Sequence, residues 1–128
     1  MKKLIAKILK KVWPANKLKP GVTFTVEQKI VLLDAIRSVK KSYLKGDVGG
    51  SCFKLQEALE SYDYFAGNIL FKELCHKYHN PDFYLAHGIA VEPHGGLQWH
   101  DGCYWWPYDD SETRIMALDI LKQAIIDD

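Results

Sequence analysis

The chain has 128 residues, of which 48% are hydrophobic and 26% charged, so it is long enough to bury one core without disulfide bonds. No apolar run approaches the roughly 20 residues that span a bilayer, and the three cysteines lack the spacing of a disulfide framework. Residues 1–19 hold seven lysines and no acid, whereas residues 20–128 hold 10 basic and 16 acidic side chains, a net charge of −6. Such a body lacks the basic face of a nucleic-acid-binding domain, so we expect no nucleic-acid partner. The odd number of cysteines favours a reducing compartment, so we expect a cytoplasmic protein.

The basic segment, residues 1–19, precedes a single small globular domain over residues 20–128. Residues 1–13 (MKKLIAKILKKVW) carry apolar side chains at helical spacing and lysines on the opposite face, which predicts an amphipathic helix that ends at Pro14. We expect its apolar face to pack on the domain or on a second subunit, which would make the protein a homo-oligomer. Contact of residues 1–13 with an anionic membrane surface is the alternative.

The globular domain is predicted to be mainly α (α+β), with four to five helices in the whole chain. Beyond residues 1–13, apolar periodicity predicts helices over residues 26–43, 52–61, 64–78 and 110–126. The expected N-caps are Thr25, Ser51 and either Asp110 or Ser111. The side chains expected to face the core are Val26, Ile30, Leu33, Ile36, Val39, Phe53, Leu55, Leu59, Phe65, Ile69, Leu70, Leu74, Cys75, Ile115, Leu118, Leu121 and Ile125, with Cys52 as a further candidate.

Residues 82–108 lack a helical period and contain four glycines, two prolines and most of the tryptophans. The sequence at 79–81 (HNP) is expected to end the preceding helix, because a residue before proline disfavours the helical conformation. We expect a short β-hairpin or an irregular aromatic, Gly-rich segment before the last helix, with strands near 83–91 and 97–106 and a turn at 92–96. An irregular segment of this length in a small domain is often functional.

Histidines and cysteines near this segment raise the possibility of a zinc or cysteine-dependent enzyme. Cys75 and His79 are four residues apart, so they would share a helix face. His100 and Cys103 are three residues apart across an expected turn. Together the four side chains offer a tetrahedral Cys2His2 set of zinc ligands. The chain has no C-x-x-C pair, and the spacing is not a common finger spacing. Buried Cys75 and hydrogen-bonded histidines are the competing interpretation, and we expect no cofactor, with zinc as the alternative.

The most unusual stretch is residues 103–110 (CYWWPYDD), which leads into the last expected helix. Arg114 lies in the first turn of that helix, where a cation opposes the helix dipole. It either pairs with Asp110, four residues earlier, or faces an anionic ligand held by aromatic rings and the helix N-terminus. Because alternate residues of a strand face opposite sides, one of the two tryptophans is expected to be structural. The candidate ligand-binding residues are Tyr104, Trp105, Trp106, Arg114, His100 and Thr113.

Residues 49–59 (GGSCFKLQEAL) and 104–125 (YWWPYDDSETRIMALDILKQAI) together resemble small, uncharacterised accessory proteins of phages and prophages. The resemblance lies in a G-x-C-x-x-L segment followed by Y-W-W-P, an arginine and a closing helix. It covers about residues 25–126 and omits the basic segment. It implies a phage-encoded protein in the host cytoplasm with an anti-defence role. The matching positions are Gly50, Cys52, Leu55, Tyr104, Trp105, Trp106, Pro107 and Arg114.

These observations predict a non-catalytic binding protein that sequesters a nucleotide-like anionic signalling molecule, with rings for stacking and Arg114 for charge. The alternative is a protein-interaction module that binds and inhibits a host protein through exposed aromatic side chains. The third hypothesis is the zinc-dependent or cysteine enzyme.

Overall fold

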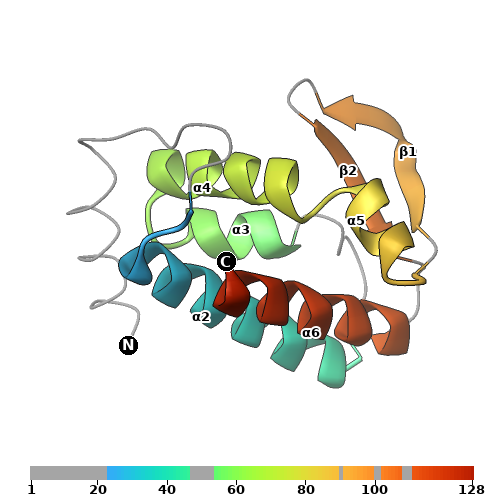
Figure 1. The fold of residues 1–128 in the computed structure, drawn as a ribbon, viewed down its shortest axis with the longest axis horizontal. Helices are drawn as coiled ribbons and strands as arrows, with labels where there is room; N and C mark the ends of the chain where they lie inside the picture. Colours follow the sequence, from blue (N-terminus) through green and yellow to red (C-terminus); the bar gives the residue numbers. More distant parts are fainter. Residues whose placement is uncertain (1–22, 47–53, 90, 100–101, 108–110) are drawn as a thin grey trace.

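A computed structural model describes residues 23–46, 54–89, 91–99, 102–107 and 111–128 of the chain. This part contains five helices and two strands, in the order α2, α3, α4, α5, β1, β2 and α6 (Figure 1). The expected mainly helical character is therefore confirmed. The expected basic helix over residues 1–13 and the rest of the basic segment up to residue 19 lie outside the described residues.

Helix α2 (Val26–Leu44) begins after Thr25, the predicted N-cap, which forms a capping box with Gln28. The Thr25 hydroxyl accepts from the Gln28 backbone N–H at 3.1 Å, and the Gln28 side chain accepts from the Thr25 N–H at 2.8 Å. Two of the backbone amides that have no partner within the helix are thus satisfied. After the helix, Gly46 has a φ of +84°, a conformation that glycine adopts without strain.

The predicted inward face of α2 is partly wrong. Val26 is 70% exposed and Ile30 40% exposed, whereas Val31 and Leu32 are fully buried. The reason is that α2 packs against α3 on one side and α6 on the other. The apolar side chains of α2 occupy more of its surface than one neighbour can bury. The positions of α3 and α6 therefore decide which of these side chains are buried.

Helices α3 (Lys54–Glu60) and α4 (Tyr64–Lys77) pack closely against each other. Asp63 caps α4 by accepting from the Ala66 N–H at 3.0 Å. A Cβ atom on Gly67 would lie 2.3 Å from the Leu59 carbonyl oxygen, so the two backbones approach to a distance that only glycine permits. Phe65, expected in the core, is instead 78% exposed.

Helix α5 (Pro81–Ala86) is absent from the sequence prediction, which assigns Phe83–Ala86 to a strand. The error has a local cause. Asn80 accepts from the Phe83 N–H at 2.9 Å and Pro81 occupies the first turn, so the same residues that end α4 also begin a new helix.

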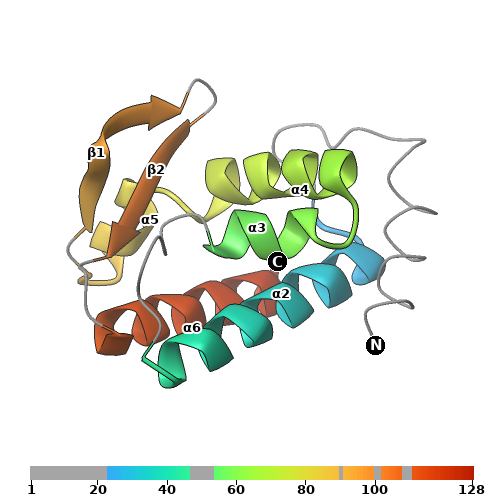
Figure 2. The same cartoon turned by 180° about the vertical axis from the view of Figure 1, so that it is seen from behind.

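Strand β1 (Val91–Trp99) pairs antiparallel with β2 (Gly102–Pro107), with an irregularity between Pro93 and Gln98. The expected turn at residues 92–96 therefore lies within β1. The backbone of β2 contacts α4, α5 and α6, and that of β1 contacts α5. The two strands thus lie at one end of the helical body (Figures 1 and 2).

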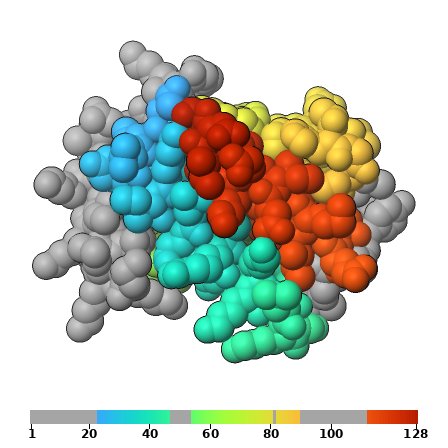
Figure 3. All heavy atoms as spheres, turned by 60° about the horizontal axis from the view of Figure 1, so that its bottom comes forward, coloured from blue at the N-terminus to red at the C-terminus, as the bar shows by residue number. Residues whose placement is uncertain are grey.

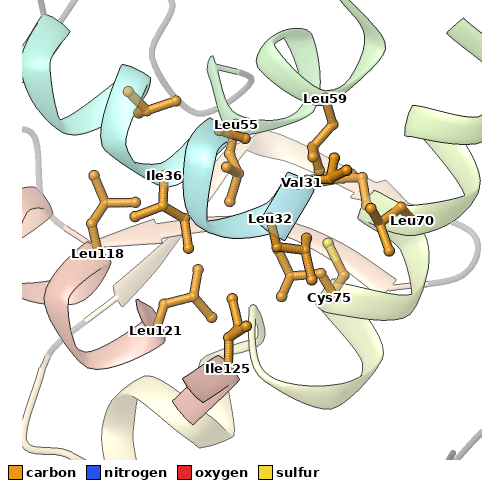
Figure 4. Close-up of a cluster of buried hydrophobic side chains, with 14 of the residues drawn as sticks. Val31, Leu32, Ile36, Leu55, Leu59, Leu70, Cys75, Leu118, Leu121 and Ile125 are labelled. Atoms are coloured by element: carbon orange, nitrogen blue, oxygen red, sulfur yellow. The ribbon is translucent and has the colours of Figure 1, made fainter. Parts of the chain in front are cut away.

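Helix α6 (Ser111–Asp127) runs antiparallel to α2, and the two lie side by side on one face of the molecule (Figure 3). Leu118, Leu121 and Ile125 are fully buried, as predicted, while Ile115 is half-buried at the edge of the core. Side chains from α2, α3, α4 and α6 meet in one cluster (Figure 4). Its labelled members are Val31, Leu32, Ile36, Leu55, Leu59, Leu70, Cys75, Leu118, Leu121 and Ile125.

Asp128 fastens the end of α6 to two other elements. Its carboxylate accepts from the Phe24 N–H at 2.7 Å and from the Tyr78 hydroxyl at 2.5 Å, and it forms an ion pair with Lys77 at 2.7 Å. Its backbone oxygen accepts from Lys29 Nζ at 2.7 Å. These bonds outweigh the effect of burial and lower the pKa of Asp128.

Candidate functional site

The predicted aromatic site falls on β2 and the start of α6. Tyr104, Trp105 and Trp106 lie on β2, where Trp105 is opposite Pro93 and Trp106 opposite Glu92 in the strand register. Because the β2 backbone contacts α6, the fold brings this strand close to the helix that carries Arg114. The side chains of the three aromatic residues, and the whole of His100 and Asp110, lie outside the described part.

Arg114 is only 5% exposed, and its guanidinium carbon lies 5.7 Å from the centre of the buried Tyr43 ring. This contact joins the first turn of α6 to the last turn of α2. A guanidinium held over an aromatic face is stabilised by the electrons of the ring. Arg114 therefore has a structural role, and its role toward a ligand stays a prediction. The neighbouring Thr113 is half-buried.

The four predicted zinc ligands are only partly described. Cys75 is buried on α4, and His79 is buried just after the helix, with its Nδ1 at 2.6 Å from the Tyr84 hydroxyl. Burial lowers the pKa of His79 to about 3 and raises that of Tyr84 well above its usual value. His100 and the Cys103 side chain lie outside the described residues, and within those residues no three His, Cys, Asp or Glu side chains form a metal-binding group.

The same geometry bears on the cysteine-nucleophile hypothesis. A catalytic thiol needs a base within hydrogen-bond reach and access for the substrate. Cys75 is 3% exposed, and one ring nitrogen of His79 is engaged by Tyr84. Both side chains thus belong to the core, where the His79 ring also makes edge contacts with Phe71 and Tyr84.

A groove between α2 and α6 is a candidate site whose lining side chains are all described. It has a volume of about 440 Å³, within the range of pockets that hold small molecules. Three aliphatic side chains of α2 form its apolar wall, and three cations with one acid line its rim. The lining residues are Ile30, Leu33, Ile36, Asp34, Arg37, Lys40 and Lys122.

The cations of the rim differ in their partners. Arg37 pairs with Asp34 at 2.6 Å, although its own side chain is 71% exposed. Lys40 pairs across the helices with Asp119 at 2.7 Å. Within the described part of the chain, Lys122 forms no ion pair.

Asp34 has a second partner besides Arg37. It accepts a short hydrogen bond from the Tyr62 hydroxyl. Burial, followed by this bond, raises the pKa of Tyr62, so the phenol remains a donor over the physiological range. The Asp34 carboxylate would therefore keep a hydrogen bond if Arg37 turned toward a ligand.

Sequence reasoning missed this groove. Leu33, Arg37 and Lys40 follow one another at helical spacing, a signal that the sequence does contain. Lys122, however, enters only because α6 packs antiparallel to α2, a relation that periodicity does not encode.

In the described residues, none of the helices combines the length and the apolar character needed to cross a membrane. Comparisons with protein families, with curated proteins and with solved structures find no match to this chain.

Proposed function

We propose that the chain is a non-catalytic binding protein that captures a small anionic molecule in the groove between α2 and α6. One observation carries this proposal: three cationic side chains, Arg37, Lys40 and Lys122, gather around an aliphatic wall in a groove of about 440 Å³. An anion with an apolar body fits such a lining, because the body displaces water from the wall while the charge meets the rim.

The ion pairs at the rim do not oppose binding strongly. The Arg37 side chain is 71% exposed, and the Lys40 and Asp119 side chains are 35% and 48% exposed. The exposed Lys40–Asp119 pair contributes at most about 1 kcal/mol. The Asp34 side chain is 12% exposed, and the hydrogen bond from Tyr62 offsets part of the loss when Arg37 leaves it. An incoming phosphate or carboxylate can therefore recruit Arg37 and Lys40, and Tyr62 continues to donate to Asp34 after Arg37 has left.

The sequence predicts a nucleotide-like signalling molecule as the ligand, and the resemblance to phage accessory proteins implies an anti-defence role. Both stay part of the proposal. The groove supports the anionic character of the ligand and adds an aliphatic wall. The ligand site that the sequence predicts, with Tyr104, Trp105, Trp106, Arg114, His100 and Thr113, is a second location, which the same experiment distinguishes from the groove.

The test is a thermal-shift screen of the full chain against AMP, cyclic dinucleotides, ADP-ribose and medium-chain carboxylates. A hit is then titrated against Lys122→Met, with Lys41→Met as the matched control, since Lys41 is also exposed but does not line the groove. The loss of one charge-assisted contact costs on the order of 1.5 kcal/mol, which is about a tenfold loss of affinity. A loss with Trp105→Ala or Trp106→Ala instead, and none with Lys122→Met, would place the ligand at β2.

A further inference from the structure

Two adjacent aromatic side chains are exposed at the start of α4. Tyr64 is 63% and Phe65 78% exposed, and their rings are in edge-to-face contact with centroids 5.5 Å apart. Phenylalanine at such exposure leaves a large apolar area in water, and exposed aromatic groups of this kind mark interaction surfaces. We call Tyr64 and Phe65 the aromatic pair.

Three carboxylates, Glu57, Glu60 and Asp63, lie on the turns of chain just before the aromatic pair. Asp63 accepts from a backbone N–H, and Glu60 accepts from the side-chain amides of Gln56 and Asn68, each at 3.0 Å. These donors are neutral, and none of the three carboxylates forms an ion pair within the described residues. These carboxylates, which precede the aromatic pair in the chain, therefore carry negative charge that no ion pair within the described residues offsets. Glu60 and Asp63 reach α4 through their hydrogen bonds with Asn68 and Ala66.

The segment 1–13 complements the aromatic pair and the three carboxylates in both apolar character and charge. Its apolar face holds leucine, isoleucine, valine and a tryptophan, and its five lysines are accompanied by no acid. The groove between α2 and α6 is a poorer surface for it, because the cations of the groove rim would repel the lysines. Charge complementarity thus favours the aromatic pair.

The segment is joined to the described part of the chain by only nine residues. The described part of the chain begins at Thr23. Residues 14–22, which join the segment 1–13 to Thr23, can span up to about 30 Å. Helices α2 and α4 both begin at the same end of the long axis of the molecule (Figures 1 and 2). A short tether of this kind gives an effective concentration in the millimolar range, so even a modest contact would be populated.

We propose that residues 1–13 dock as an amphipathic helix on the aromatic pair, with their lysines beside Glu57, Glu60 and Asp63. The contact is intramolecular and covers the apolar area of both partners. This proposal does not depend on the anion-binding groove.

Zero-length carbodiimide crosslinking of the full chain, followed by mass spectrometry, tests the contact directly. The expected result is amide crosslinks between lysines of residues 1–13 and Glu57, Glu60 or Asp63, formed within one molecule. Mixing ¹⁵N-labelled and unlabelled chains separates the outcomes: crosslinks between molecules would mean that a second copy covers the aromatic pair. That result, or crosslinks to other carboxylates only, overturns the proposal.

A variant shows whether the aromatic pair holds the segment. Phe65→Ser is expected to remove most of these crosslinks, whereas Leu44→Ser, at a 68% exposed position on α2, is expected to leave them. Circular dichroism of both variants verifies that the helices are retained. Unchanged crosslinking in a folded Phe65→Ser variant also overturns the proposal. If this variant does not fold, the crosslinks of the unmodified chain still test the contact.

Discussion

The buried pair of His79 and Tyr84 predicts how the stability of the fold depends on pH. Burial lowers the pKa of His79 to about 3 in the folded chain, against 6.5 for an unperturbed histidine. Between these values the unfolded chain binds a proton at His79 and the folded chain does not. Lowering the pH through this window therefore stabilises the unfolded state, and the contribution of neutral His79 to folding is retained only above about pH 6.5.

The size of the effect follows from the same values. At pH 5, about 1.5 units below the unfolded pKa, His79 alone lowers the free energy of unfolding by about 2 kcal/mol. Asp128, whose pKa is also lowered, loses its contribution only as the pH falls below its ordinary value of 3.8. The interval from pH 6.5 to 5 thus separates the effect of His79 from that of Asp128.

The assay is urea unfolding at several pH values between 7.5 and 5, with His79→Asn beside the unmodified chain. Asparagine does not titrate and offers a polar group near the Tyr84 hydroxyl, so the variant is expected to be less stable at pH 7.5 but nearly independent of pH. His76→Asn, at an exposed position, is the control and is expected to keep the slope of the unmodified chain. An equal slope in His79→Asn would refute the reasoning.

Three substitutions test the packing. Gly67→Ala places a Cβ 2.3 Å from the Leu59 carbonyl oxygen, and we expect a net loss of about 2 kcal/mol in chemical unfolding after the gain of about 1 kcal/mol in helix propensity; a stabilised variant would contradict the close approach. Arg114→Ala removes the contact with Tyr43 and is expected to lower the melting temperature by several degrees, on the order of 1–2 kcal/mol; a stable variant that loses anion binding would instead make Arg114 a ligand contact. Asp128→Ala removes a carboxylate that is 4% exposed and holds three partners, with an expected loss on the order of 2 kcal/mol in urea unfolding at pH 7; unchanged stability there would show that these bonds are not formed.

Local signals of the sequence predict local structure well. Thr25 and Gln28 are three residues apart, so the start of α2 follows from neighbouring residues alone. Asn80 and Pro81 show the limit of the same approach, because one pair of residues both ends α4 and begins α5. Only the residues beyond Pro81 decide whether a new helix follows.

Features that depend on how the helices pack cannot be predicted from neighbouring residues in the sequence. The apolar pattern of α2 permits either Ile30 or Val31 to face inward, and the positions of α3 and α6 bury Val31. The need for glycine at residue 67 likewise arises from the approach of α3. The groove combines Arg37 with Lys122 from a helix far along the chain, so its charge could not be inferred from either segment alone.

The central claim is that the rim of the α2–α6 groove binds an anion, and isothermal titration calorimetry of the best anion from the screen tests it most directly. The dissociation constant of Lys122→Met is expected to rise about tenfold relative to Lys41→Met, and the affinity of the unmodified chain is expected to fall as salt is raised. Equal dissociation constants for the two lysine variants would contradict the claim.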